Sequence, residues 1–209
     1  MAALSYNERV TTSASTPRIQ LTQALYLLVL ALVAASDGRL LQGACALLAQ
    51  SAGFLLVVGA VLGRLWTTLF IAGRKEERLV CEGPYARCRH PLYLCSVIGA
   101  LGLGLTSLSL TLTLVLPSFV AVIVATAARR EDAVLLATHG HAWREYRDSV
   151  PAFWPGRSRT KQPESIAVPP QIYRKAFLDA ASFLGLWLLV LLIEGLRAAG
   201  AWQAFFRLP

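Results

Sequence analysis

Long apolar stretches alternate with short polar segments along this chain of 209 residues. A helical crossing of a bilayer takes about 20 apolar residues, because the hydrocarbon core is about 30 Å thick. Five stretches reach or approach that length: 19–35, 41–62, 94–106, 108–128 and 176–193. The third and fourth are separated only by Ser107, with Gly102 and Gly104 nearby, so together they predict a helical hairpin. The pattern predicts an all-α, polytopic membrane protein with about five transmembrane helices.

The composition strengthens this prediction. Hydrophobic residues make up 56% of the chain and charged residues 15%, whereas soluble domains carry about 25% charged residues. The cysteines match no zinc-binding spacing, and we assign them to packing and expect no metal site: they are Cys45, Cys81, Cys88 and Cys95.

Positive charges are distributed unevenly over the polar segments. With two crossings before Gly73 and the hairpin after it, the N-terminus, 73–92 and 129–175 share one side, which holds 16 of the 20 Lys and Arg residues. The positive-inside rule makes that side cytoplasmic. Anionic lipid headgroups then explain the net charge of +8, and we expect no nucleic-acid partner.

A few charged residues lie within or beside the apolar stretches. We expect Arg64 to extend toward the cytoplasmic interface, with 65–72 lying along that interface. Asp179 and Glu194 are close to the ends of the last stretch, and we expect both to point to water.

The first of two charged clusters spans 73–93. Gly83-Pro84 signals a turn, and Pro91 suits the first position of a helix, where a missing N–H costs nothing. Free N–H groups and the helix dipole favour an anionic group at such a helix start. The turn brings four polar or aromatic side chains there, at the bilayer surface: Tyr85, Arg89, His90 and Tyr93.

The second cluster begins with Arg129-Arg130-Glu131-Asp132 at the end of the hairpin and continues through Leu135. Gly140 should end that helix. The next segment, 141–147, is amphipathic and places Trp143 and Tyr146 on one face. Together the clusters predict a cytoplasmic, amphipathic-helical binding region.

The two clusters together resemble a known family. The residues that carry the resemblance are Gly63-Arg64-x-Trp66, Gly73-Arg74-Lys75, Leu79-Val80-x-Glu82-Gly83-Pro84-Tyr85-x-x-x-Arg89-His90-Pro91-Leu92-Tyr93, Glu131-Asp132-x-x-Leu135 and Gly140-x-x-x-x-x-Tyr146-x-x-x-Val150-Pro151. In order and spacing, residues 63–155 are similar to the isoprenylcysteine carboxyl methyltransferases and the related phospholipid methyltransferases. The resemblance implies an integral membrane enzyme with a cytoplasmic pocket for S-adenosylmethionine, closed by C-terminal helices. It also implies a lipophilic substrate that enters from the bilayer and is methylated.

The resemblance implies site residues as well. Its cofactor contacts fall on Leu79, Val80, Tyr85, His90, Pro91, Leu92, Tyr93 and Glu131. The chemistry of the residues agrees, because Arg89 and the helix start at Pro91 suit the cofactor carboxylate and Glu131 suits its ammonium. Tyr85 or Tyr93 suits the sulfonium through a cation–π contact. The adenine is expected against apolar side chains: Leu79, Val80 and Leu135.

This chain departs from the family pattern near the reacting group. Family members usually carry an arginine one helical turn before the downstream acid, where this chain has Ala127. Arg129 or Arg130 is the candidate replacement, from another helical angle. We therefore expect Arg89, His90 and Arg130 to take part in catalysis. A carboxylate nucleophile needs no general base, whereas an amine would give its proton to His90.

We interpret the whole chain, 1–209, as one integral membrane methyltransferase domain. It comprises N-terminal helices in 1–72, a cofactor-binding and catalytic core in 73–155, a linker in 156–175 and a C-terminal helix in 176–209. The sequence leaves the methyl acceptor and the oligomeric state open. Methylation of a phospholipid or another small lipophile on nitrogen or sulfur is an alternative, and so is a non-enzymatic membrane scaffold. The favoured activity is carboxyl O-methylation of a lipophilic membrane substrate by S-adenosylmethionine.

Overall fold

The computed structural model describes residues 31, 33, 36–37, 42–71, 79–156, 166, 168, 170–201 and 206–207. The helices of these segments are α2 (Ala44–Ile71), the 3-10 helix η1 (Gly83–Ala86), α3 (Pro91–Thr106), α4 (Leu110–His139), α5 (His141–Ser149) and α6 (Pro170–Ala198). Two short strands, β1 (Ser36–Asp37) and β2 (Phe206–Arg207), pair in parallel. The first predicted apolar stretch, 19–35, lies outside the described residues except at positions 31 and 33. Apart from the two short strands, the described part is all-helical, as predicted.

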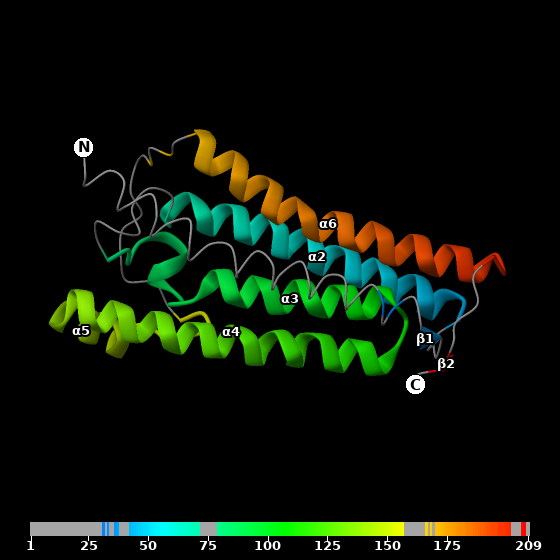
Figure 1. Ribbon diagram of the computed structural model, residues 1–209, viewed down its shortest axis with the longest axis horizontal. Coiled ribbons are helices and arrows are strands. Elements are labelled where there is room, and N and C mark those ends of the chain that lie inside the picture. Colours follow the sequence, from blue (N-terminus) through cyan, green and yellow to red (C-terminus); the bar gives the residue numbers. More distant parts are fainter. Residues whose placement is uncertain are drawn as a thin grey trace, which may run out of the picture.

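Four long helices run side by side along the length of the molecule. In Figure 1 they follow one another in the order α6, α2, α3 and α4. Three of them, α2, α4 and α6, are long and apolar enough to cross a membrane, and α3 is a shorter apolar helix. The described residues therefore contain three candidate spans and one shorter apolar helix, where the sequence predicted about five crossings.

The α3 and α4 helices form the predicted hairpin. They are joined by residues 107–109 alone, and the Ser107 N–H donates to the Leu103 and Gly104 carbonyls. Ser109 precedes α4, where its hydroxyl accepts a hydrogen bond from the Leu112 N–H at 3.3 Å. That bond satisfies one of the N–H groups that a helix start leaves unpaired.

The α2 and α3 helices approach each other most closely at two glycines. A Cβ atom added to Gly102 would lie 2.7 Å from the Gly53 carbonyl oxygen, and one added to Gly53 would lie 2.6 Å from the Gly102 oxygen. One turn further along α3, Thr106 donates to the Gly102 carbonyl and accepts from the Trp187 indole of α6 at 3.0 Å. Small residues and one hydroxyl thus hold three helices together.

Two expectations for charged residues are wrong. The α2 helix continues without a break to Ile71, so 65–71 do not form a separate interfacial segment. Glu194 does not point to water: it is 4% exposed and accepts a hydrogen bond from Arg197 at 2.6 Å. Arg197 also donates to the Val33 carbonyl. A charge near the end of an apolar helix is stabilised by a partner on the protein, because facing lipid would cost more.

We predict that Gly102→Ala lowers the free energy of unfolding by about 1–3 kcal/mol, because the added methyl group collides with backbone of α2 that has no room to move. Denaturation of the purified protein with SDS in mixed micelles measures this. Gly59→Ala is the matched control, because a Cβ atom there meets nothing within 4 Å. It should leave stability unchanged or raise it by up to about 1 kcal/mol. Equal effects of the two substitutions would contradict the close approach of α2 and α3.

Candidate active site

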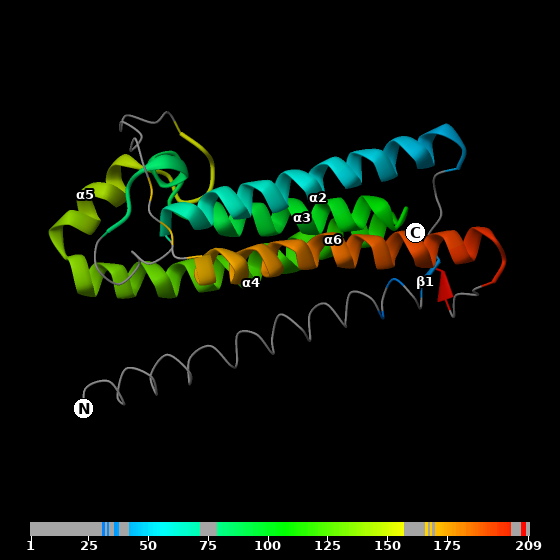
Figure 2. The ribbon, with the colours of Figure 1, turned by 90° about the horizontal axis from the view of Figure 1, so that it is seen from above.

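The two charged clusters of the sequence meet at one end of the helical bundle. Figures 1 and 2 show η1, α5, the start of α3 and the end of α4 at this end, opposite β1 and β2. Gly83 begins η1 with φ of 59°, and a side chain there would collide with the Phe70 ring at the end of α2. Gly140, with φ of 52°, makes the predicted break between α4 and α5. Both turns need the left-handed backbone that glycine adopts easily.

The segment that follows α5 pairs with the loop that precedes α3. The Arg89 N–H donates to the Pro151 carbonyl at 2.9 Å, and the His90 N–H donates to the Ala152 carbonyl at 3.0 Å. The thiol of Cys88 lies 3.3 Å from the Ala152 oxygen in the same pairing. Burial raises the pKa of this thiol above its usual value. Cys88 is therefore a packing residue, as expected.

Two aromatic side chains fix α5 against this loop. Trp143 and Tyr146 are both buried, and the Tyr146 hydroxyl donates to the Tyr85 carbonyl at 2.7 Å. Burial raises the pKa of Tyr146 far above that of an ordinary phenol, so the hydroxyl remains a donor. The cluster around them is apolar and includes Leu79, Cys81, Leu135, Leu136 and Val150.

Asp132 joins the two charged clusters. One of its carboxylate oxygens lies 3.1 Å from Arg89 Nη1 and the other 2.9 Å from His90 Nε2. Glu131, one position earlier on α4, lies 3.8 Å from His90 Nδ1. The His90 ring is buried and stacks on Tyr93 with ring centroids 5.5 Å apart. The imidazole is thus held between two carboxylates and an aromatic ring.

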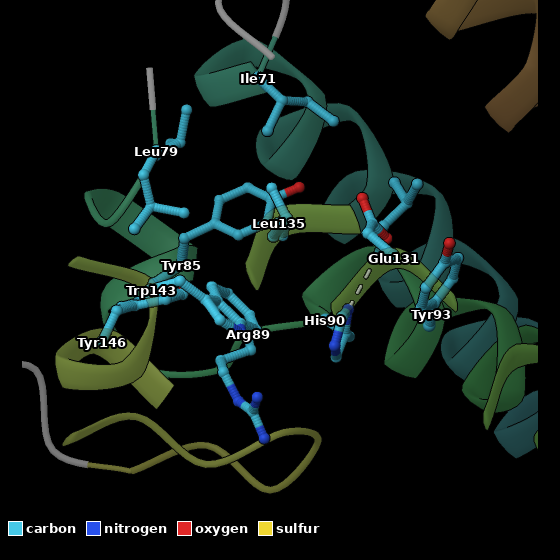
Figure 3. A pocket seen from close by; sticks show the side chains of 12 residues that line it. Ile71, Leu79, Tyr85, Arg89, His90, Tyr93, Glu131, Leu135, Trp143 and Tyr146 are labelled. Atoms are coloured by element: carbon cyan, nitrogen blue, oxygen red, sulfur yellow. Dashed lines mark hydrogen bonds and ion pairs between the residues drawn. The ribbon is translucent and has the colours of Figure 1, made fainter. Parts of the chain in front are cut away.

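These residues surround a pocket with an empty volume of about 670 Å³, including its open mouth. Figure 3 shows Tyr85 reaching toward Leu135 and Glu131, whereas the guanidinium end of Arg89 extends away from them. Burial, and next the charge of Glu131, raise the pKa of Tyr85 far above its usual range, so Tyr85 stays a neutral phenol. The lining consists of Ile71, Leu79, Val80, Tyr85, Arg89, His90, Leu92, Tyr93, Glu131, Leu135, Trp143 and Tyr146.

The pocket brings together most of the residues that the sequence assigned to cofactor binding. Pro91 is buried at the first position of α3 but is not part of the lining. Arg130 is exposed on α4 and does not line the pocket either. The catalytic role of Arg130 stays a prediction, as do the roles of the other site residues.

Three lining residues were not assigned to the site from the sequence. The sequence pattern could have indicated Trp143 and Tyr146, because they share one face of an amphipathic segment. It could not have indicated Ile71, which is one apolar residue at the end of an apolar helix. The start of α3 also offers fewer donors than expected, since the Tyr93 and Leu94 N–H groups donate to the His90 carbonyl.

We predict that Asp132→Asn lowers the free energy of unfolding by about 1–3 kcal/mol, because an amide is a weaker partner than a carboxylate for Arg89 and His90. The same SDS titration measures the change. Asp148→Asn is the control, since Asp148 is exposed and pairs only with its neighbour Arg147 at 3.1 Å within the described residues. The link through Asp132 would be refuted if both variants unfolded at the same SDS concentration.

Comparison with known proteins places the chain in a family. The family model of the isoprenylcysteine carboxyl methyltransferases (ICMT) matches residues 44–137. The nickel-cobalt-cadmium resistance protein NccN of Alcaligenes xylosoxydans xylosoxydans is 36% identical over 157 residues, which cover 75% of this chain and 73% of the relative. The cobalt-zinc-cadmium resistance protein CzcN of Cupriavidus metallidurans is 36% identical over 152 residues, 73% of this chain and 70% of the relative. No solved structure matches. The matched region contains the α2–α4 bundle and both charged clusters, and the chain belongs to the isoprenylcysteine carboxyl methyltransferase family of membrane proteins.

Proposed function

We propose that this protein transfers a methyl group from S-adenosylmethionine to a carboxylate of a lipophilic substrate dissolved in the membrane. One observation carries the proposal: a pocket with charged, aromatic and apolar walls opens at the end of a bundle of apolar helices. A cofactor bound there lies beside the lipid phase, where a lipophilic acceptor concentrates. Family membership supports the same reaction class.

The side chains of the pocket fit the cofactor's four chemical groups. The Glu131 carboxylate suits the ammonium, and the neutral ring of Tyr85 suits the sulfonium. Arg89 is the arginine of the lining and suits the ligand carboxylate by its charge, although its guanidinium is also bonded to Asp132. The adenine fits against the apolar wall made by Ile71, Leu79, Val80 and Leu135.

When bound, S-adenosylmethionine supplies a methyl carbon on a positively charged sulfur, whose bond to carbon breaks while sulfur keeps the electron pair. The protein's contribution is orientation and exclusion of water. Holding two reactants in an aligned geometry lowers a barrier by about 7–11 kcal/mol. A carboxylate acceptor attacks without losing a proton, so the protein needs no base for it. For an amine acceptor, His90 is the residue that takes the proton, because Asp132 fixes its Nε2 and leaves Nδ1 toward Glu131.

The pocket end of the bundle faces the cytoplasm in this proposal. The positive-inside rule supports it, because the pocket-end part of α4 carries Arg129 and Arg130 and the first turns of α6 carry Arg174 and Lys175. S-adenosylmethionine is a charged, water-soluble cofactor and must reach the pocket from an aqueous side. The lipophilic acceptor would reach the same pocket from the surrounding membrane lipids.

The names of the two relatives suggest where this chemistry is used. Both relatives are named for resistance to divalent metals. Carboxylates are strong ligands of divalent cations, and conversion to a methyl ester removes the negative charge. We propose that this protein supports metal resistance by lowering the number of anionic oxygen ligands at the membrane.

We predict that the purified protein binds S-adenosylhomocysteine with 1:1 stoichiometry and that Glu131→Gln weakens the binding about tenfold or more. Loss of a charged hydrogen bond costs about 1.5–3 kcal/mol, which corresponds to that change. Isothermal titration calorimetry in detergent measures both constants. Glu145→Gln is the control, because Glu145 is exposed on α5 and contacts only His141 within the described residues. Absence of binding by the unmutated protein would overturn the proposal and favour the scaffold.

We predict that label passes from methyl-labelled S-adenosylmethionine to a prenyl thioether of N-acetylcysteine, and that the product is a base-labile ester. An aminophospholipid and a lipophilic thiol, offered in the same micelles, separate the alternative acceptors. Label on the aminophospholipid alone would replace carboxyl methylation by N-methylation. The assay with Arg130→Gln tests the catalytic role predicted for that arginine from the sequence.

A further inference from the structure

Arg64 lies among the apolar helices on the lipid side of the pocket. It belongs to the same face of α2 as Ile71, which follows seven residues later and lines the pocket. Its Nη1 donates to the Ser96 hydroxyl of α3 at 2.7 Å. Ser96 in turn follows the pocket residue Leu92 by one helical turn, a rise of about 6 Å. The guanidinium therefore lies along the α2–α3 seam, about one turn away from the pocket lining toward the membrane.

The partner of this guanidinium is a carboxylate that is open to its surroundings. Arg64 Nη2 donates to Asp179 Oδ2 of α6 at 2.5 Å. The Arg64 side chain is 13% exposed, but that of Asp179 is 55% exposed. Because more than half of the Asp179 side chain is exposed, a second carboxylate can approach the guanidinium from the same side. From the sequence we expected Asp179 to point to water and Arg64 to extend to the interface. Neither expectation included a bond between the two.

The surroundings of the ion pair are those of a lipid-facing site. Phe177 and Leu178, directly before Asp179, are exposed apolar residues. The Phe183 ring lies under the guanidinium, with Arg64 Cζ 5.2 Å from its centroid. Figures 1 and 2 show the first turns of α6 at the pocket end of the bundle, beside the end of α2. An amphiphile in the membrane therefore reaches Asp179 with its acyl or prenyl chain still against apolar side chains.

No other described arginine near the pocket is equally suited to an acceptor carboxylate. Arg89 is bonded to Asp132 and lies against the Trp143 ring. Arg129 and Arg130 are exposed on α4, so neither offers an acceptor a buried cation. Arg64 Nε is buried and has no hydrogen-bond partner among the described residues, so displacement of Asp179 would leave the guanidinium with donors for both oxygens of a ligand carboxylate.

We infer that Arg64 recognises the carboxylate of the lipophilic acceptor and that Asp179 occupies its place until the acceptor displaces it. The inference rests on the proposed function and names its specificity residue. Asp179 already shows that a carboxylate fits against this guanidinium. An acceptor bound to Arg64 would hold its carboxylate on the membrane side of the pocket, about one helical turn from the pocket lining.

If this inference is correct, substitutions of Arg64 and of Asp179 change the affinity for the acceptor in opposite directions. Direct binding of a fluorescent prenyl thioether of N-acetylcysteine to the purified protein in micelles is the measurement. Arg64→Gln should weaken binding about tenfold or more, because the charged partner is lost. Asp179→Asn should strengthen binding about threefold, because a competing carboxylate is removed. The carboxamide analogue of the probe should bind equally to all three proteins.

A salt bridge with only a structural role predicts a different pattern. Both variants would then lower the unfolding midpoint in SDS and weaken the binding of acid and carboxamide alike, and this result would overturn the inference. Saturable binding of the acid that does not change in Arg64→Gln would overturn it as well, and so would absence of binding to the unmutated protein. Arg64→Lys keeps the charge and serves if Arg64→Gln does not fold, with intermediate affinity expected. Arg174→Gln, exposed at the start of α6, is the control for loss of one positive charge.

Cofactor binding separates this inference from the proposed function. Arg64 does not line the pocket, so S-adenosylhomocysteine affinity should be the same in Arg64→Gln and in the unmutated protein. If S-adenosylhomocysteine fails to bind but the acid probe binds through Arg64, the proposed reaction is wrong and the carboxylate site stands. If the cofactor binds and the affinity of the acid probe is the same in Arg64→Gln and in the unmutated protein, the carboxylate site is wrong and the reaction class stands.

Discussion

The bonds of Asp132 to Arg89 and His90 connect the two parts of the chain on which the pocket depends. Arg89 and His90 belong to the loop before α3, whereas Asp132 lies more than 40 residues later on α4. A carboxylate with two charged or polar partners gives a defined geometry, because each oxygen has its own donor. The loop, the helix and the aromatic residues of α5 then close around one space. This junction acts together with the backbone pairing of Arg89 and His90 with Pro151 and Ala152.

Much of the architecture follows from the spacing of apolar and turn residues. The hairpin, the start of α3 at Pro91 and the break at Gly140 each depend on local chemistry, and the structure confirms them. Local chemistry suffices here because a helix start, a turn and a helix end each involve only a few consecutive residues. The continuous α2 helix is the exception. The charge of Arg64 suggested that the membrane interface lies at this position. Its partners on α3 and α6 satisfy that charge, so α2 continues as one helix beyond it.

The contacts between distant segments could not be predicted in the same way. The family pattern brought Tyr85, His90 and Glu131 to one site, but their partners depend on how the helices pack. Glu194 and Arg197 are three residues apart on α6, so their pairing is local, but nothing in the local sequence shows that the pair is buried or that Arg197 also meets the Val33 carbonyl. Hydropathy gives the cost of a charge in an apolar helix, whereas the partner that offsets the cost comes from the tertiary structure. The partners of charged residues in membrane helices are therefore the features that are hardest to predict from sequence.

The close approach of Gly53 and Gly102 lies in the half of the bundle away from the pocket. Helices that are joined tightly at one end can separate only at the other. The pocket opens at the other end of the bundle, so lipids meet it from a single leaflet, and those in the opposite leaflet are about 30 Å of hydrocarbon away. The proposed reaction would then modify only one face of the membrane and create a chemical difference between the two leaflets. That difference would last as long as the product crosses the bilayer slowly.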